Sequence, residues 1–175
     1  AAVGSRSGRA AREGGGGGRP LLPPAAGAAP AQTRPPVLRY DYGAWSNDGF
    51  RLIVSGRDPD GRIVVGSVNR DGGDPQVREA AGIGLAWVQH AVQRPNGQIV
   101  MLGSPTGSAS PMRLFTGDGL ALTGDIGFAP PVRVAWSPDR AAVLVVTVEN
   151  GAVEYYVAFV NGSIRRITPE LGGAL

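Results

Sequence analysis

The chain has 175 residues, a formal net charge of +3, one histidine and no cysteine. This composition excludes a disulfide framework, a thiol nucleophile, a cysteine zinc site and a His-rich metal site, and no apolar run nears the ~18 residues of a transmembrane helix. We therefore expect one domain, or one domain with a tail, with no cofactor, no metal and no transmembrane segment.

Residues 1–36 form one compositional block. They hold a run of five glycines, several prolines and five arginines against a single acid, Glu13. They have no aromatic residue and few large apolar ones, so they cannot bury enough surface to offset the entropy of ordering. We expect a disordered Gly/Pro/Ala/Arg-rich linker. Residues 37–175 are close to neutral, so we expect no nucleic-acid partner, because such partners need a basic patch on the fold.

From residue 37 onward, short apolar β-branched or aromatic segments alternate with Gly, Asn, Asp or Pro turns every eight to twelve residues. This spacing predicts an all-β fold. Residues 76–90 are the one place where we expect a short helix. The clearest predicted strands are 52–54, 63–65, 99–102, 143–148 and 155–160.

A stronger signal is an internal repeat. The turn sequence AWSNDG at 44–49 returns as AWSPDR at 135–140, with a weaker middle copy, VQRPNG, at 92–97. Two strands, a further turn and a short closing strand follow each copy. The predicted closing strands are 76–78, 120–123 and 163–168. A four-stranded unit written three times, with a period near 45 residues, is typical of propeller blades. We place the blades at about 37–80, 81–126 and 127–170.

With Arg165-Arg166-Ile167-Thr168 and the strand 155–160, the motif AWSPD at 135–139 resembles the TolB-like propeller repeat, a relative of the WD repeat. The resemblance covers most of residues 37–170 and is loosest in the middle copy, where Gln93 replaces Trp. It implies four-stranded antiparallel blades within a six- to eight-bladed ring. It also implies a protein-interaction or envelope scaffold, or the propeller half of a peptidase whose catalytic domain lies elsewhere.

The turn chemistry agrees with the repeat. Ser, Pro, Asp and Gly in this order suit a tight turn. Arg140 stands where Gly is usual, so we expect the third turn to need no positive φ. Trp45 and Trp136 end the first strands of their repeats, so we expect both to pack between adjacent blades.

Three blades cannot close a ring, and each blade buries its faces only against neighbours. We expect either a fragment of a longer propeller or a ring completed by a partner, with two copies joining as three plus three blades. An open three-blade stack capped by loops is a third possibility.

No catalytic constellation emerges from the motifs. His90 is the one imidazole and has no Gly-x-Ser-x-Gly elbow to serve. The segment Asp58–Gly61 resembles a calcium loop but has Asn69 where the bidentate Glu belongs, so we expect a hairpin turn there. We expect no catalytic, cofactor or metal residues. Aromatic and arginine side chains form the predicted interaction surface, namely Tyr40, Tyr42, Trp87, His90, Arg133, Arg165 and Arg166.

The sequence therefore predicts a non-catalytic propeller scaffold for protein–protein interaction, on the extracytoplasmic side or in the envelope of a bacterium. One alternative is the propeller portion of a serine peptidase-like hydrolase. Another is a carbohydrate-binding propeller that uses Trp87 and Tyr40.

Overall fold

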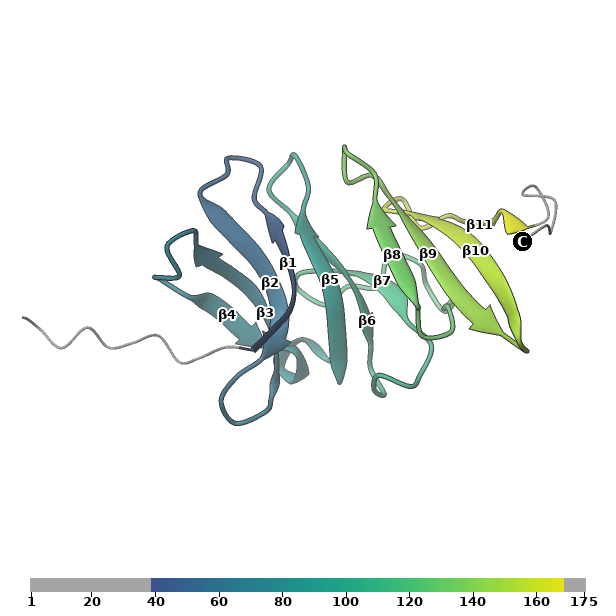
Figure 1. The fold of residues 1–175 in the computed structure, drawn as a ribbon, viewed down its shortest axis with the longest axis horizontal. Coiled ribbons are helices and arrows are strands. Elements are labelled where there is room, and N and C mark those ends of the chain that lie inside the picture. Colours follow the sequence, from purple (N-terminus) through teal and green to yellow (C-terminus); the bar gives the residue numbers. More distant parts are fainter. Residues whose placement is uncertain (1–38, 169–175) are drawn as a thin grey trace, which may run out of the picture. The chain divides into compact units, whose positions relative to one another are not determined.

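The computed structural model describes residues 39–168, so the predicted linker at 1–36 lies outside the described residues. The described chain forms three antiparallel sheets, each a meander in which consecutive strands pair (Figure 1). The first sheet contains β1 (Arg39–Trp45), β2 (Arg51–Arg57), β3 (Ile63–Asn69) and β4 (Gln76–Glu79). The second contains β5 (Trp87–Gln93), β6 (Ile99–Ser104) and β7 (Arg113–Thr116). The third contains β8 (Arg133–Trp136), β9 (Ala142–Glu149), β10 (Ala152–Phe159) and β11 (Ile164–Arg166).

This is the all-β, blade-by-blade architecture expected from the sequence. All five of the clearest predicted strands are present, and the short helix expected within 76–90 is a 3₁₀ turn at Ala80–Ile83. Successive side chains along a strand point to opposite faces of the sheet, and these strands carry apolar residues on both. Both faces of a sheet are therefore suited to packing.

The middle blade departs from the prediction, because the expected closing strand at 120–123 is not a strand. This segment meets β7 through one isolated bridge, Phe115 with Ala121. Two backbone hydrogen bonds accompany it, from the Thr116 amide to Leu120 at 2.9 Å and from the Leu122 amide to Leu114 at 2.7 Å. The Leu114 amide donates to the Thr123 hydroxyl at 3.2 Å. A side-chain oxygen thus stands where a paired strand would offer a backbone carbonyl, and the ladder ends there.

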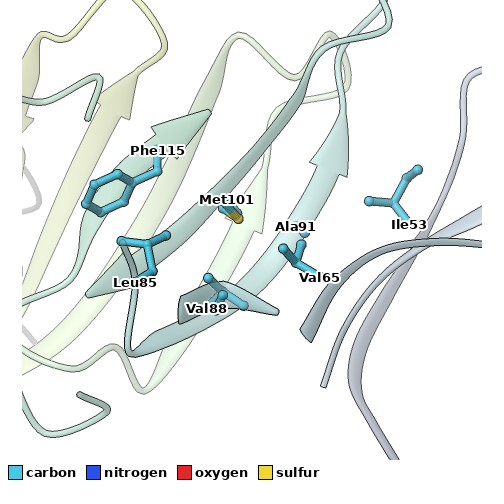
Figure 2. Packing of buried hydrophobic residues seen from close by; sticks show 8 residues of the cluster. Ile53, Val65, Leu85, Val88, Ala91, Met101 and Phe115 are labelled. Carbon is cyan, nitrogen blue, oxygen red and sulfur yellow. The ribbon is translucent and has the colours of Figure 1, made fainter. Parts of the chain in front are cut away.

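Two apolar cores join the sheets. The first lies between the first and second sheets, with Ile53 and Val65 on one side. Figure 2 shows these two residues facing the second-sheet side chains. The second core joins the second and third sheets. Its buried members are Leu102, Leu114, Phe128, Val143, Val145 and Ala158. Each sheet therefore stabilises its neighbours by burying apolar side chains between them.

The strands of the first sheet approach one another closely at a glycine. A Cβ atom at Gly56 would lie 2.1 Å from the carbonyl oxygen of Arg39. Only glycine at position 56 therefore leaves room for the backbone at the start of β1, next to the β-bulge between Tyr40 and Tyr42.

Candidate interaction surface

The repeated turn has one geometry in the first and third sheets. Ser46 donates its hydroxyl to Asp48 at 2.6 Å, and Ser137 donates to Asp139 at 2.6 Å. Each carboxylate also accepts the amide two residues further on, at 3.0 Å in both turns. The pKa values of both aspartates are lowered, first by the serine hydrogen bond and then by this amide. The Ser-x-Asp pattern is therefore a turn device rather than a catalytic pair.

The middle turn keeps the device in part. The Gln98 amide donates to the Asn96 side-chain oxygen at 3.1 Å, and the Gly97 amide donates to the Arg94 carbonyl at 2.9 Å. The β1–β2, β5–β6 and β8–β9 turns lie at the same end of the three sheets (Figure 1). Residues of the three repeats can therefore be compared position by position.

Arg140 corrects the expectation for the third turn. Its φ is +56°, as the φ of its equivalents Gly49 and Gly97 is positive at +72° and +84°. In all three copies the amide of this residue closes the turn on the carbonyl three residues back, and the residue itself then takes the left-handed conformation as the chain returns into the second strand. The arginine side chain does not prevent that conformation and leaves strain in the third turn.

The position that ends the first strand of each repeat carries the contact between sheets. We call it the tryptophan position, and it holds Trp45, Gln93 and Trp136. The Trp136 Nε1–H donates to the backbone oxygen of His90 in the second sheet at 2.9 Å. The Gln93 side-chain oxygen accepts the Asn47 amide of the first sheet at 3.2 Å. In both cases the side chain reaches the preceding sheet.

Trp45 behaves differently from Trp136. Its side chain is 54% exposed, whereas Trp136 is partly buried against the core between the second and third sheets. The prediction of packing between blades is therefore confirmed for Trp136, whereas for Trp45 no blade within residues 39–168 stands before it to test the prediction. The reason is positional: Trp136 has a preceding sheet to contact, and the described chain begins with the sheet that carries Trp45.

Three of the predicted surface residues occupy one repeat position. Tyr42, His90 and Arg133 each lie three residues before the tryptophan position. Tyr42 and His90 meet between the first and second sheets, with ring centroids 4.4 Å apart and planes tilted by 57°. Arg133 is exposed on β8. The structure thus places two of these residues inside an interface and leaves the third on the surface.

His90 sits in a β-bulge of β5, with φ at +53°. Its Nδ1 is buried and has no hydrogen-bond partner within the described residues. Burial lowers the pKa of His90 below its usual value of 6.5. Burial also raises the pKa of Tyr42, and Arg140 partly opposes this effect. At neutral pH the pair is an uncharged aromatic contact, which suits packing better than proton transfer.

Trp87 and Tyr40 lie apart from this row. The Arg57 guanidinium carbon sits 5.0 Å from the centroid of the Trp87 ring, as expected for a cation–π contact. Trp87 is half-buried, whereas Tyr40 is 44% exposed near the start of β1. Of these two aromatic side chains, Tyr40 is the more accessible to a partner.

The two arginines of β11 lie on the edge strand of the third sheet. Arg166 forms a fork with buried Glu154, donating from Nε at 2.7 Å and from Nη2 at 2.5 Å. Thr168 donates its hydroxyl to the same carboxylate at 2.6 Å. The Arg166 hydrogen bond, ahead of that from Thr168, lowers the pKa of Glu154. Arg166 is therefore engaged in an ion pair within its own sheet, and Arg165 is exposed beside it.

Sequence reasoning missed Gln93 and Asn47. The backbone amide of Asn47 donates to the Gln93 side chain, and the side-chain amide of Asn47 donates to the Arg94 carbonyl. The available signal was the alignment itself, since Gln93 occupies the tryptophan position. Between residues 39 and 168, no group of three His, Asp or Glu side chains is placed to hold a metal ion. No helix in that range is long and apolar enough to cross a membrane.

The comparisons with known proteins concern the fold. No family model matches the chain, and no curated protein sequence matches it. Among solved structures, it is similar to TolB from Acinetobacter baumannii at 17% identity, with a TM-score of 0.49 over 71% of this chain and 30% of that one. It is also similar to a eukaryotic initiation factor at 11% identity, with a TM-score of 0.45 over 74% of this chain and 32% of that one. This chain therefore spans about a third of the length of each structure, and the TolB-like repeat stays a prediction from the residues that suggested it.

Proposed function

We propose that this chain is a non-catalytic propeller segment that binds protein, with its contact residues on those faces of the first and third sheets that do not pack on the second sheet. The observation that carries the proposal is that side chains at the same repeat position differ in exposure. Trp136 and Gln93 contact a neighbouring sheet, while Trp45, at the same repeat position, is 54% exposed. A large aromatic side chain at a position used for contact elsewhere in the molecule is suited to protein contact.

Exposed residues of both outer sheets extend this surface. Tyr40 on β1 is 44% exposed, and Arg133 on β8 is exposed as well. Tyrosine, tryptophan and arginine are the side chains most enriched at binding hot spots, because they combine large contact area with a polar group. The resemblance of the repeat to TolB-like propellers supports placing this role at the bacterial envelope, on the extracytoplasmic side.

Site-specific photo-crosslinking in the bacterium tests the binding role. We would place p-benzoylphenylalanine at Tyr40 or Arg133 in the full chain, and at Ile126 as the control, which is 60% exposed in a loop outside both faces. The proposal expects discrete protein adducts from the first two positions and none from the third. No adduct from any position, or the same adducts from all three, would contradict it.

The non-catalytic part of the proposal has its own test. The purified chain is incubated with a fluorophosphonate probe, which labels activated serine nucleophiles. We expect no labelling of this chain. Labelling that is lost after a single Ser→Ala substitution would instead favour the serine hydrolase alternative.

A further inference from the structure

The two interfaces inside the chain follow one rule. In the third sheet, Trp136 pairs with Val143 across the strands, so both side chains lie on the same face. That face packs on Leu102 and Leu114 of the second sheet. In the second sheet the equivalent face, which carries Ile99 and Met101, packs on the first sheet. The face at the tryptophan position thus always meets the opposite face of the preceding sheet.

Within residues 39–168, the first sheet presents the same face and no sheet stands before it. Trp45 pairs with Leu52, and Leu52 with Val68, so these side chains share one face. Val54 and Val68, each only 2% exposed, belong to a buried apolar cluster that, among the described residues, is built from the first sheet alone. Trp45 pairs with Leu52, which packs against this cluster, and its own side chain is 54% exposed. We call this surface the outward face of the first sheet.

The third sheet presents the complementary face. Leu144, Val146 and Val148 alternate with the core residues of β9 and therefore point away from the second sheet. Tyr155 and Val157 of β10 pair with this set. Val148 is 49% exposed. We call this surface the outward face of the third sheet, and Arg133 joins it because Arg133 pairs with Val146.

We propose that the occupant of the outward face of the first sheet is the outward face of the third sheet of a second copy of this chain. Inside the molecule, the face at the tryptophan position already packs twice on the opposite face of the preceding sheet. The new interface therefore continues the established ones. Each copy contributes one face of each kind, so two copies related by a two-fold axis satisfy all four faces. This inference rests on the proposed protein-binding role and names its partner.

The repeat also assigns the central contact. Trp136 donates to the carbonyl of His90, which lies three residues before the tryptophan position of the second sheet. The equivalent residue of the third sheet is Arg133. Trp45 of one copy then meets β8 of the other at Arg133. There its indole N–H can bond a backbone oxygen, and its ring can receive the guanidinium.

Complementation between two defective variants tests this arrangement. Trp45→Glu disables one face and Val148→Glu the other, so sedimentation velocity should show each variant as a monomer and the wild type as a dimer. An equimolar mixture retains one intact interface and should sediment as a dimer again. Ile126→Glu, in a loop outside both faces, is the matched control and should remain dimeric.

Several results would overturn the arrangement. One is a wild type that stays monomeric at the highest attainable concentration. Another is a mixture that fails to associate although both variants keep the wild-type circular dichroism spectrum. A third is a Val148→Glu variant that remains dimeric, which would indicate contact between two first sheets.

A second measurement avoids disruptive variants. In protein labelled with 5-fluorotryptophan, Trp45→Phe identifies the Trp45 resonance by its loss. On dilution, this ¹⁹F resonance should shift while that of Trp136 stays in place; a Trp45 resonance that does not move with concentration would contradict the inference. If the chain is a monomer yet photo-crosslinking at Tyr40 and Arg133 yields adducts with other proteins, the second-copy inference fails and the binding role stands.

Discussion

Replacement of Arg140 by glycine should stabilise the protein. Arg140 has φ at +56°, in a turn whose other two copies have glycine at the same place. An L-residue in this region costs about 1–2 kcal/mol relative to the right-handed region. Glycine in turn loses roughly 0.5–1 kcal/mol more backbone entropy on folding. The free energy of unfolding of Arg140→Gly should therefore rise by about 1 kcal/mol, in the range seen when backbone conformation and residue type are matched.

The assay is urea denaturation followed by tryptophan fluorescence. The midpoint should rise with an unchanged m value, because the area exposed on unfolding stays the same. Arg140→Ala is the control, since it removes the same side chain but keeps a Cβ at positive φ. Gly49→Ala is the reciprocal change, at φ +72° with open space around the position, and should cost about 1 kcal/mol. If Arg140→Gly is no more stable than Arg140→Ala, the turn stores no strain and the reasoning is refuted.

Three further predictions concern packing and pH. Gly119→Ala should lower the free energy of unfolding by about 3 kcal/mol, and Gly97→Ala by about 1 kcal/mol. Both glycines have positive φ, but of the two only Gly119 would place a Cβ 2.3 Å from a backbone oxygen. Equal losses in urea denaturation would contradict this. Trp136→Phe should lower the free energy of unfolding by about 1–2 kcal/mol, because the His90 carbonyl loses its hydrogen-bond donor. Trp45→Phe should change it by no more than about 0.5 kcal/mol. Equal losses for the two variants would disprove the assigned contact. The folded pKa of His90 is lowered by burial, so the unfolded chain binds the proton first. Stability relative to His90→Phe should therefore fall as pH drops below about 6.5, and parallel pH profiles of the two proteins would count against a buried neutral imidazole.

The sequence predicted the blade repeat because its signals are local. The Ser-x-Asp turn is closed by hydrogen bonds that span two residues, and the strands on either side carry β-branched runs. Such patterns depend on neighbours within a few positions, so single-sequence reasoning can read them. The predicted surface was harder, because exposure depends on what packs against each side chain. Among its members, Tyr42 and His90 contact each other with tilted rings, and Arg166 is paired with Glu154.

By itself, the sequence determined the type of fold, the period of the repeat and the inter-blade contact of Trp136. Only the tertiary structure decided that Trp136 is engaged while Trp45 is exposed, that Gln93 takes the tryptophan's role in the second sheet, and that residues 120–123 leave the ladder. The physical reason is separation along the chain. The contacts of Trp136 and Gln93 join residues 46 positions apart, so within residues 39–168 the same motif is buried where another sheet precedes it and exposed where none does.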